Sequence, residues 1–298
     1  METIIDFAGS KFNHIDNIAQ TEKYLSENPD FHKRLDRLIW AYHEIGHVIP
    51  QWNGKLFSGH NFAYSESNSE IECSYQLIKL CFYKYGFIAL RNALELGLLS
   101  IYWDKDNNAE ILIQDWYKSK EDTPFKKQIT KGLKTIENIN QFCKRFDLFI
   151  KIDNVYDNLS DFTHTKGYSF SGQNLNHANF TKFNERTIRT WGNLLEQVIQ
   201  LLLSVYILKY PVAIQNTPIQ EKFGINGPFG GFLEVFQSEH IKEVLDPDEL
   251  KALQEISDND EGAKSLRDWV NSYPDISEEE FKKQVDEFDE FMDKHKKE

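Results

Sequence analysis

The stretch from Tyr85 to Trp103, YGFIALRNALELGLLSIYW, contains only two charged side chains, Arg91 and Glu95. The rest of it is mostly apolar around the whole circumference of a helix, which is typical of a central, buried helix. Arg91 and Glu95 are four residues apart, so they can touch on one helix face. Because an unpaired charge inside a protein is very unfavourable, we expect both to be paired and to contact polar groups from another segment.

Helical spacing extends over most of the chain, and no segment has the alternation of a β-strand. The expected helices are residues 31–49, ended by Pro50, then 68–103 and 153–164, and finally 182–210, stopped by Pro211, with a loop at 50–66. The sequence therefore predicts an all-α protein built as a helical bundle.

The chain divides into three parts: an N-terminal segment (1–30), the bundle (31–212) and an acidic helical extension (213–298). The acidity lies near the end, because residues 244–298 hold 18 acidic and 8 basic side chains, while the whole chain has a net charge of −13. In the extension, Asp246-Pro247 and Ser277-x-x-Glu280 are helix N-terminal signals. The last helix carries an apolar stripe, which must bury against the bundle or a second subunit: Phe281, Val285, Phe288 and Met292.

Composition narrows the class of protein. A net charge of −13 argues against a broad basic surface that coats nucleic acid, although it allows a local basic groove. The three cysteines form no CxxC pair, and the first residues lack a signal-peptide pattern. The apolar stretch at residues 194–212 contains Glu196, Gln197 and Gln200 and is too polar to span a bilayer comfortably. We expect a cytoplasmic protein with no membrane partner.

A possible metal site lies in AYHEIGHVI, residues 41–49, which places His43, Glu44 and His47 in an HExxH pattern. Histidines at i and i+4 can share one Zn²⁺, and the glutamate between them can act as general base on a metal-bound water. The alternative is that both histidines are polar residues at the edge of a packed helix.

The zinc interpretation needs a third ligand. Glu70 and Glu72 lie 23 and 25 residues after His47, at the start of the next expected helix. The HExxH stretch resembles zincin peptidases, in whose glutamate type a downstream helix supplies this ligand. The resemblance implies a zinc-dependent metallopeptidase or hydrolase, with Glu70 or Glu72 completing the site.

A second polar group lies in the stretch Y156DNLSDFTH164. Tyr156, Ser160 and His164 recur at i, i+4 and i+8, so they share a helix face. If this face packs on Arg91 and Glu95, the five side chains form one cluster. An imidazole near a guanidinium can cleave RNA without metal, because the imidazole acts as acid or base and the guanidinium stabilises the phosphorane. The alternative is a structural ion pair, with His164 favoured at a helix C-terminus by the helix dipole.

LRNALELGLLSIYW followed by VYDNLSDFTHTKG resembles a group of bacterial all-α domains found in abortive-infection and other phage-defence proteins. Their bundle resembles the HEPN nucleotide-binding and RNase superfamily. The resemblance covers about residues 68–210 and carries over to these positions: Arg91, Glu95, Tyr156, Leu159, Ser160 and His164. HEPN RNases, however, hold Arg-x(4–6)-His within one helix, and here only Arg37 and His43 have that spacing.

The resemblance implies a cytoplasmic HEPN-like defence or stress protein, namely an RNA-directed nuclease or toxin that needs no cofactor. It also implies a homodimer or other homo-oligomer. The acidic extension would cap the bundle, mimic nucleic acid or bind a basic protein partner. Two alternatives stay open: the zinc hydrolase, and a non-enzymatic binding module whose buried charges are structural. Whether the chain is an enzyme is left open.

Overall fold

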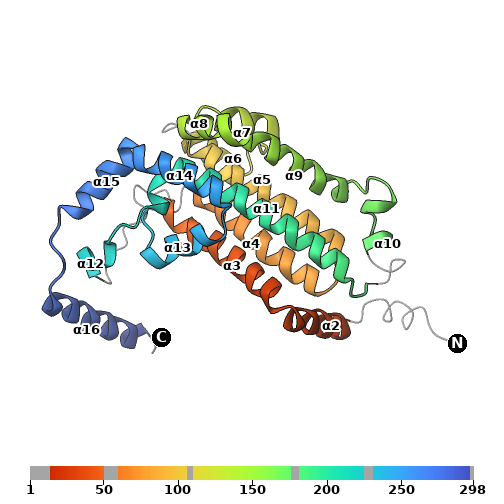
Figure 1. Ribbon diagram of the computed structural model, residues 1–298, viewed down its shortest axis with the longest axis horizontal. Helices are drawn as coiled ribbons and strands as arrows, with labels where there is room; N and C mark the ends of the chain where they lie inside the picture. Colours follow the sequence, from red (N-terminus) through yellow and green to blue (C-terminus); the bar gives the residue numbers. More distant parts are fainter. Residues whose placement is uncertain (1–13, 50–59, 106–109, 176–180, 225–230, 296–298) are drawn as a thin grey trace.

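The computed structural model describes residues 14–49, 60–105, 110–175, 181–224 and 231–295. Within these ranges every regular element is a helix and no strand occurs, which confirms the predicted all-α bundle. Figure 1 shows the long helices lying side by side, with α15 and α16 forming an arm at one end.

The first half of the fold supplies most of the bundle. Its α-helices are α2 (His14–Glu27), α3 (Pro29–Ile45), α4 (His60–Lys79), α5 (Tyr83–Trp103), α6 (Glu110–Tyr117), α7 (Lys126–Leu133), α8 (Glu137–Phe146) and α9 (Leu148–Thr163).

The second half completes the core and forms the extension. Its α-helices are α10 (Gly172–Leu175), α11 (Glu185–Lys209), α12 (Ile219–Phe223), α13 (Val235–Glu243), α14 (Pro247–Asn259), α15 (Glu261–Asn271) and α16 (Glu278–His295). Within the described ranges, 3₁₀ turns link helices at Gly46–Val48, Tyr168–Phe170 and Pro211–Ile214.

Helices α5 and α11 form the centre of the bundle. α5 packs against α4, α9 and α11, and α11 also packs against α3. The two central helices approach closely at Gly97, where a Cβ atom would lie 2.6 Å from Leu202 Cδ2. The predicted central role of the Tyr85–Trp103 stretch is therefore confirmed, because its apolar side chains are buried on several faces.

The helix expected over residues 68–103 is wrong in its extent. The chain turns between α4 and α5, with Cys81 in the left-handed region at φ 63°. The amide of Phe82 donates to the carbonyl of Leu77 at 2.8 Å, which closes the end of α4. No glycine or proline marks this turn, so the sequence pattern missed it. The loop expected at 50–66 is also too long, because α4 begins at His60; residues 50–59 lie outside the described ranges.

Other expected boundaries agree more closely with the structure. The second long apolar helix is α11, which ends at Lys209, just before Pro211. The helix expected at 31–49 is α3 followed by the Gly46–Val48 turn. The helix expected at 153–164 begins earlier, at Leu148, because Asp147 adopts a left-handed conformation (φ 50°) that separates α8 from α9.

The extension packs on the bundle through α12 to α15. Its buried residues Ile219, Ile241, Leu253 and Val270 belong to the same apolar cluster as the bundle core. Both predicted N-terminal signals are present. Asp246 caps α14 by accepting from the amides of residues 248 and 249, and Ser277 and Glu280 bond reciprocally at the start of α16.

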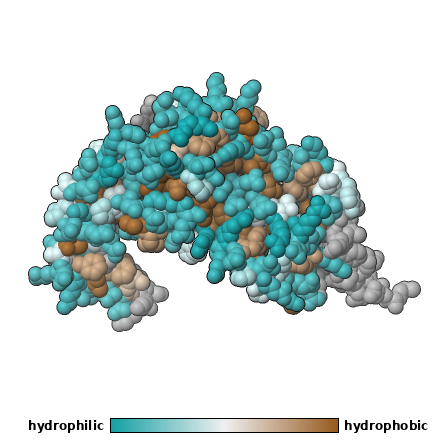
Figure 2. Space-filling view, in the orientation of Figure 1, coloured by the Kyte–Doolittle hydropathy of each residue, from teal (hydrophilic) through white to brown (hydrophobic). Residues whose placement is uncertain are grey.

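The apolar stripe of α16 is not fully buried within the chain, because Phe288 is 49% exposed and Met292 is 40% exposed. Gln284 of this helix donates to the carbonyl of Phe223 at 3.1 Å and so ties α16 to α12. In Figure 2 apolar side chains gather on this arm, while most of the visible surface is hydrophilic.

Helix α11 is long and apolar enough to cross a membrane by length and composition alone. In its most apolar window, 78% of the residues are buried inside the bundle. A core helix passes the same test, and α11 occupies the position of a core helix.

Candidate functional site

The guanidinium of Arg91 joins α5 to α9. Its Nε donates to Oγ of Ser160 at 3.1 Å, and its Nη2 donates to Oε1 of Glu95 at 3.0 Å and to Oη of Tyr156. Tyr156 in turn donates to Oε1 of Glu95 at 2.7 Å. The structure therefore brings four of the predicted residues into one network, which we call the α5–α9 cluster: Arg91, Glu95, Tyr156 and Ser160.

The α5–α9 cluster is half-buried rather than sealed inside the bundle. The side chain of Arg91 is 18% exposed and that of Glu95 is 34% exposed. Nη1 of Arg91 has no hydrogen-bond partner among the described residues. A fixed guanidinium with one free edge near the surface is able to bind an anion.

The helices meet in this way because α5 and α9 run antiparallel. Phe87 stacks on Phe162 with ring centroids 4.0 Å apart, and further along Lys84 donates to Thr165 at 2.6 Å. The aromatic pair is buried and anchors the two helices. At the edge of this contact, Arg91 of α5 then faces Ser160 of α9, and one turn further along Glu95 faces Tyr156.

Tyr156 lies between two cations. The Cζ atom of Arg91 is 4.8 Å from its ring centroid, and Nζ of Lys126 is 4.2 Å away. Burial, and then its hydrogen bond to Glu95, raises the pKa of Tyr156. The phenol therefore stays protonated at neutral pH, where it serves as a hydrogen-bond donor rather than as a base.

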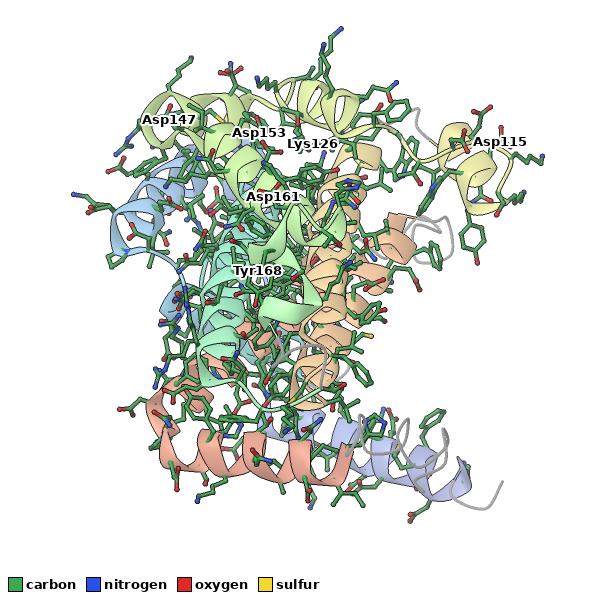
Figure 3. The ribbon with its side chains drawn as sticks, turned by 90° about the vertical axis from the view of Figure 1, so that its right-hand side faces the viewer. Asp115, Lys126, Asp147, Asp153, Asp161 and Tyr168 are labelled. Carbon is green, nitrogen blue, oxygen red and sulfur yellow. The ribbon has the colours of Figure 1, made fainter. Side chains whose placement is uncertain are left out.

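Lys126 was not among the candidates that the sequence indicated. It pairs with Asp153 at 2.8 Å and with Asp157 at 3.5 Å, both on α9. Figure 3 shows Lys126 beside Asp153 at the α7 end of α9. The only signal in the sequence was the i, i+4 spacing of Asp153 and Asp157, which favours a cation between them but does not identify the residue that supplies it.

His164 lies at the edge of the α5–α9 cluster. It is the C-cap of α9, and its amide donates to the carbonyl of Ser160 at 2.9 Å. Its side chain is exposed and forms no hydrogen bond within the described part of the chain. His164 thus lies one helical turn beyond Ser160, the residue of α9 that Arg91 contacts. The side chains of Arg91 and His164 form no direct hydrogen bond.

The two histidines of the HExxH motif face solvent, whereas its glutamate faces the interior of the bundle. His43 and His47 are exposed, with ring centroids 5.9 Å apart. The carboxylate of Glu44 is buried, and Nδ1 of His240 on α13 lies 3.1 Å from it. A glutamate that is turned inward and paired in this way cannot polarise a water held between the two exposed imidazoles.

The expected third zinc ligands are engaged elsewhere. Glu70 accepts from Asn92 on α5 at 3.3 Å, and burial raises the pKa of its carboxyl. Glu72 is exposed and accepts from Asn68 at 3.1 Å. Among the described residues, no three histidine, cysteine or acidic side chains converge as a metal site would require. The side chains that the structure describes therefore do not fit the zinc interpretation.

The exposed face of α3 carries other polar side chains. Arg37 pairs weakly with Glu243 at 3.8 Å, and the side chains of both are more than half exposed. Trp40 is 60% exposed and contacts the ring of His43 edge-on, with centroids 5.8 Å apart. Arg37 and His43, which have the Arg-x(5)-His spacing, are therefore both at the surface, and the ring of His43 contacts Trp40.

Comparisons with family models, with curated proteins and with solved structures gave no match for this chain.

Proposed function

We propose that the chain is a cytoplasmic HEPN-like protein of the defence or stress type that acts on RNA without a metal, through the α5–α9 cluster and His164. The observation that carries the proposal is the partly exposed guanidinium of Arg91, which three side chains hold in place while Nη1 has no hydrogen-bond partner among the described residues. Such a group can bind a phosphate without reorganising first.

Each side chain has a distinct role in this proposal. Arg91 stabilises the charge that develops on the phosphate, and Glu95 and Ser160 hold the guanidinium in position. His164 is exposed and can reach a ligand from solvent, so it acts as the acid or base. Tyr156 donates a hydrogen bond to Glu95 and does not act as the acid or base.

The test is cleavage of RNA by purified protein in the presence of EDTA. Wild type should cleave, and His164→Ala should lower the rate by about 100-fold or more, the usual contribution of a general acid or base. Arg91→Lys should also be slow, because an ammonium cannot reproduce the three hydrogen bonds that Nε and Nη2 make to Ser160, Glu95 and Tyr156. Circular dichroism and the urea midpoint establish that each variant is folded.

His43→Ala is the matched control, since His43 is an exposed histidine on α3, outside the α5–α9 cluster. It should cleave at the wild-type rate. Loss of cleavage in His43→Ala with full activity in His164→Ala would move the reaction to the α3 face and overturn the proposal. A wild-type protein that cleaves no RNA would favour the binding-module alternative.

A further inference from the structure

The segment from Lys118 to Lys151 has a charge opposite to that of the rest of the chain. It holds nine basic and four acidic side chains, a net charge of +5, whereas the remaining residues hold 25 basic and 43 acidic ones. It includes α7, α8 and the start of α9, at one end of the bundle (Figures 1 and 3). The acidic average of the chain hides this local basic surface.

Two lysines on α7 and the lysine that caps its C-terminal end form a stripe that faces solvent. Lys127, Lys131 and Lys134 are spaced by four and three residues, so they share one helix face, and all three are exposed. The opposite face of α7 is buried through Ile129 and Leu133. Packing of the apolar face therefore fixes the direction in which this lysine stripe points.

The lysine stripe has no carboxylate partner within the described ranges. The ion pairs of this region use other cations: Lys120, Lys126, Arg145 and Lys151. Lys134 lies over the ring of Phe149 at 4.9 Å, a contact that leaves its ammonium able to meet an anion. Three lysines kept together without counter-charges favour a polyanionic ligand.

An aromatic ring lies at the start of the same helix. Phe125 is 80% exposed, and its amide is fixed by a hydrogen bond to Gln128 Oε1 at 2.9 Å. An exposed ring beside a basic stripe is suited to stack a base while the lysines follow the phosphates. This combination favours a single-stranded nucleic acid, because every nucleotide supplies both a base for the ring and a phosphate for the lysines.

The stripe also adjoins the α5–α9 cluster. Lys126 begins α7 and lies over the ring of Tyr156, which is bonded to Glu95 and Arg91. A strand lying along α7 would therefore pass from the lysine stripe toward Arg91. From Lys127 to Lys134 the stripe is about 10 Å long, enough for about three phosphates of a stacked strand.

We infer that the α7 surface, formed by Phe125, Lys127, Lys131 and Lys134, binds the backbone of single-stranded RNA and directs it to the α5–α9 cluster. This inference rests on the proposed function for the identity of the ligand. It adds the surface that holds the strand, which is separate from the residues that act on it.

The test measures binding separately from cleavage. The probe is a fluorescein-labelled 30-nucleotide single-stranded RNA of mixed sequence, and its anisotropy is followed from 25 to 200 mM KCl with full-length His164→Ala protein. Adding Lys127→Gln, Lys131→Gln and Lys134→Gln to this protein should weaken binding at least 10-fold at low salt. The slope of log K against log salt should fall by about 2, the value for three lost contacts on a single strand.

The matched control removes three exposed lysines from the acidic arm, as Lys282→Gln, Lys283→Gln and Lys294→Gln. It changes the net charge equally and should leave affinity and slope unaltered. Equal losses in both triple variants would mean that only net charge matters and would overturn the inference. So would an absence of RNA binding, or binding of the unsubstituted protein to vesicles containing phosphatidylserine but not to RNA.

The two proposals fail in different ways. RNA binding that depends on the lysine stripe, with no cleavage by wild type, keeps the inference and removes the nuclease. Cleavage by wild type with unchanged binding in the α7 triple variant keeps the nuclease and removes the inference.

Discussion

Arg91 and Ser160 are 69 residues apart in the chain, and a 3.1 Å hydrogen bond from Nε to Oγ joins them across the contact of α5 with α9. The bond gives the arginine in the apolar helix the polar contact that its sequence context required. It also makes the stability of the bundle and the geometry of the candidate site depend on the same side chain.

Arg91→Met should destabilise the protein by about 2 kcal/mol, because Glu95 and Tyr156 lose a charged partner in a half-buried position. The free energy of unfolding in urea measures this change. Lys23→Met is the control, since Lys23 and Glu27 form an exposed surface pair. An Arg91→Met protein as stable as wild type would mean that solvent already satisfies the partners of the guanidinium.

Glu44→Ala should destabilise the protein by about 1–2 kcal/mol, because it removes a buried carboxylate bonded to His240 and loosens α13 from α3. His47→Ala, at an exposed position of the same motif, should have little effect on stability. Urea denaturation and zinc analysis of both variants separate the two interpretations. If the wild-type protein binds one zinc ion per chain and His47→Ala binds none, the zinc interpretation is correct.

Gly46→Ala should destabilise the protein by about 1–3 kcal/mol, the usual cost of overpacking. A Cβ atom there would lie 2.1 Å from the ring of Tyr64, whose hydroxyl donates to the carbonyls of Tyr42 and His43. Gly262→Ala is the milder case, because its Cβ atom would lie 3.3 Å from Oδ1 of Asp260, the cap of α15, which would have to shift by only a few tenths of an ångström. It should cost less stability than Gly46→Ala in thermal or urea unfolding, because the gain in helix propensity offsets part of the crowding.

Stability should fall above about pH 10, where an unfolded tyrosine ionises. Burial raises the pKa of Tyr75 to about 12, and it also raises the pKa of Tyr42, Tyr83 and Tyr206 above that of a free tyrosine. Below pH 10 these phenols are protonated in both states and contribute nothing to the pH dependence. Above it the unfolded chain releases protons that the folded chain retains, so unfolding becomes more favourable.

Absorbance of tyrosinate near 295 nm, followed together with circular dichroism, tests this pH dependence. The exposed tyrosines should titrate first. The buried ones should titrate only together with the loss of helix signal. Smooth titration of all 13 tyrosines in a folded protein would contradict the buried hydroxyl network.

The sequence by itself determined the helical character of the chain and several of the helix ends. Apolar periodicity predicts α3, α5 and α11. Local signals mark helix ends: Asp246 and Ser277 cap the helices that follow them, and Pro211 follows the end of α11. The sequence alone also predicts that Arg91 and Glu95 contact other polar groups, because a charge inside a buried apolar helix is unfavourable unless it is paired.

Only the tertiary structure decided which partners those groups found. Glu44 turns inward because His240, 196 residues later in the chain, lies against it, and no spacing rule relates the two. The turn at Cys81 has no glycine or proline signal, and the packing of α4 on α5 imposes it. His164 shares the helical register of Ser160 yet lies in solvent, because α9 ends there and no described side chain hydrogen-bonds to its ring. Local sequence specifies the backbone dihedral preferences of a segment and which face of a helix is apolar. Which side chains meet across the bundle depends on how all the helices pack together.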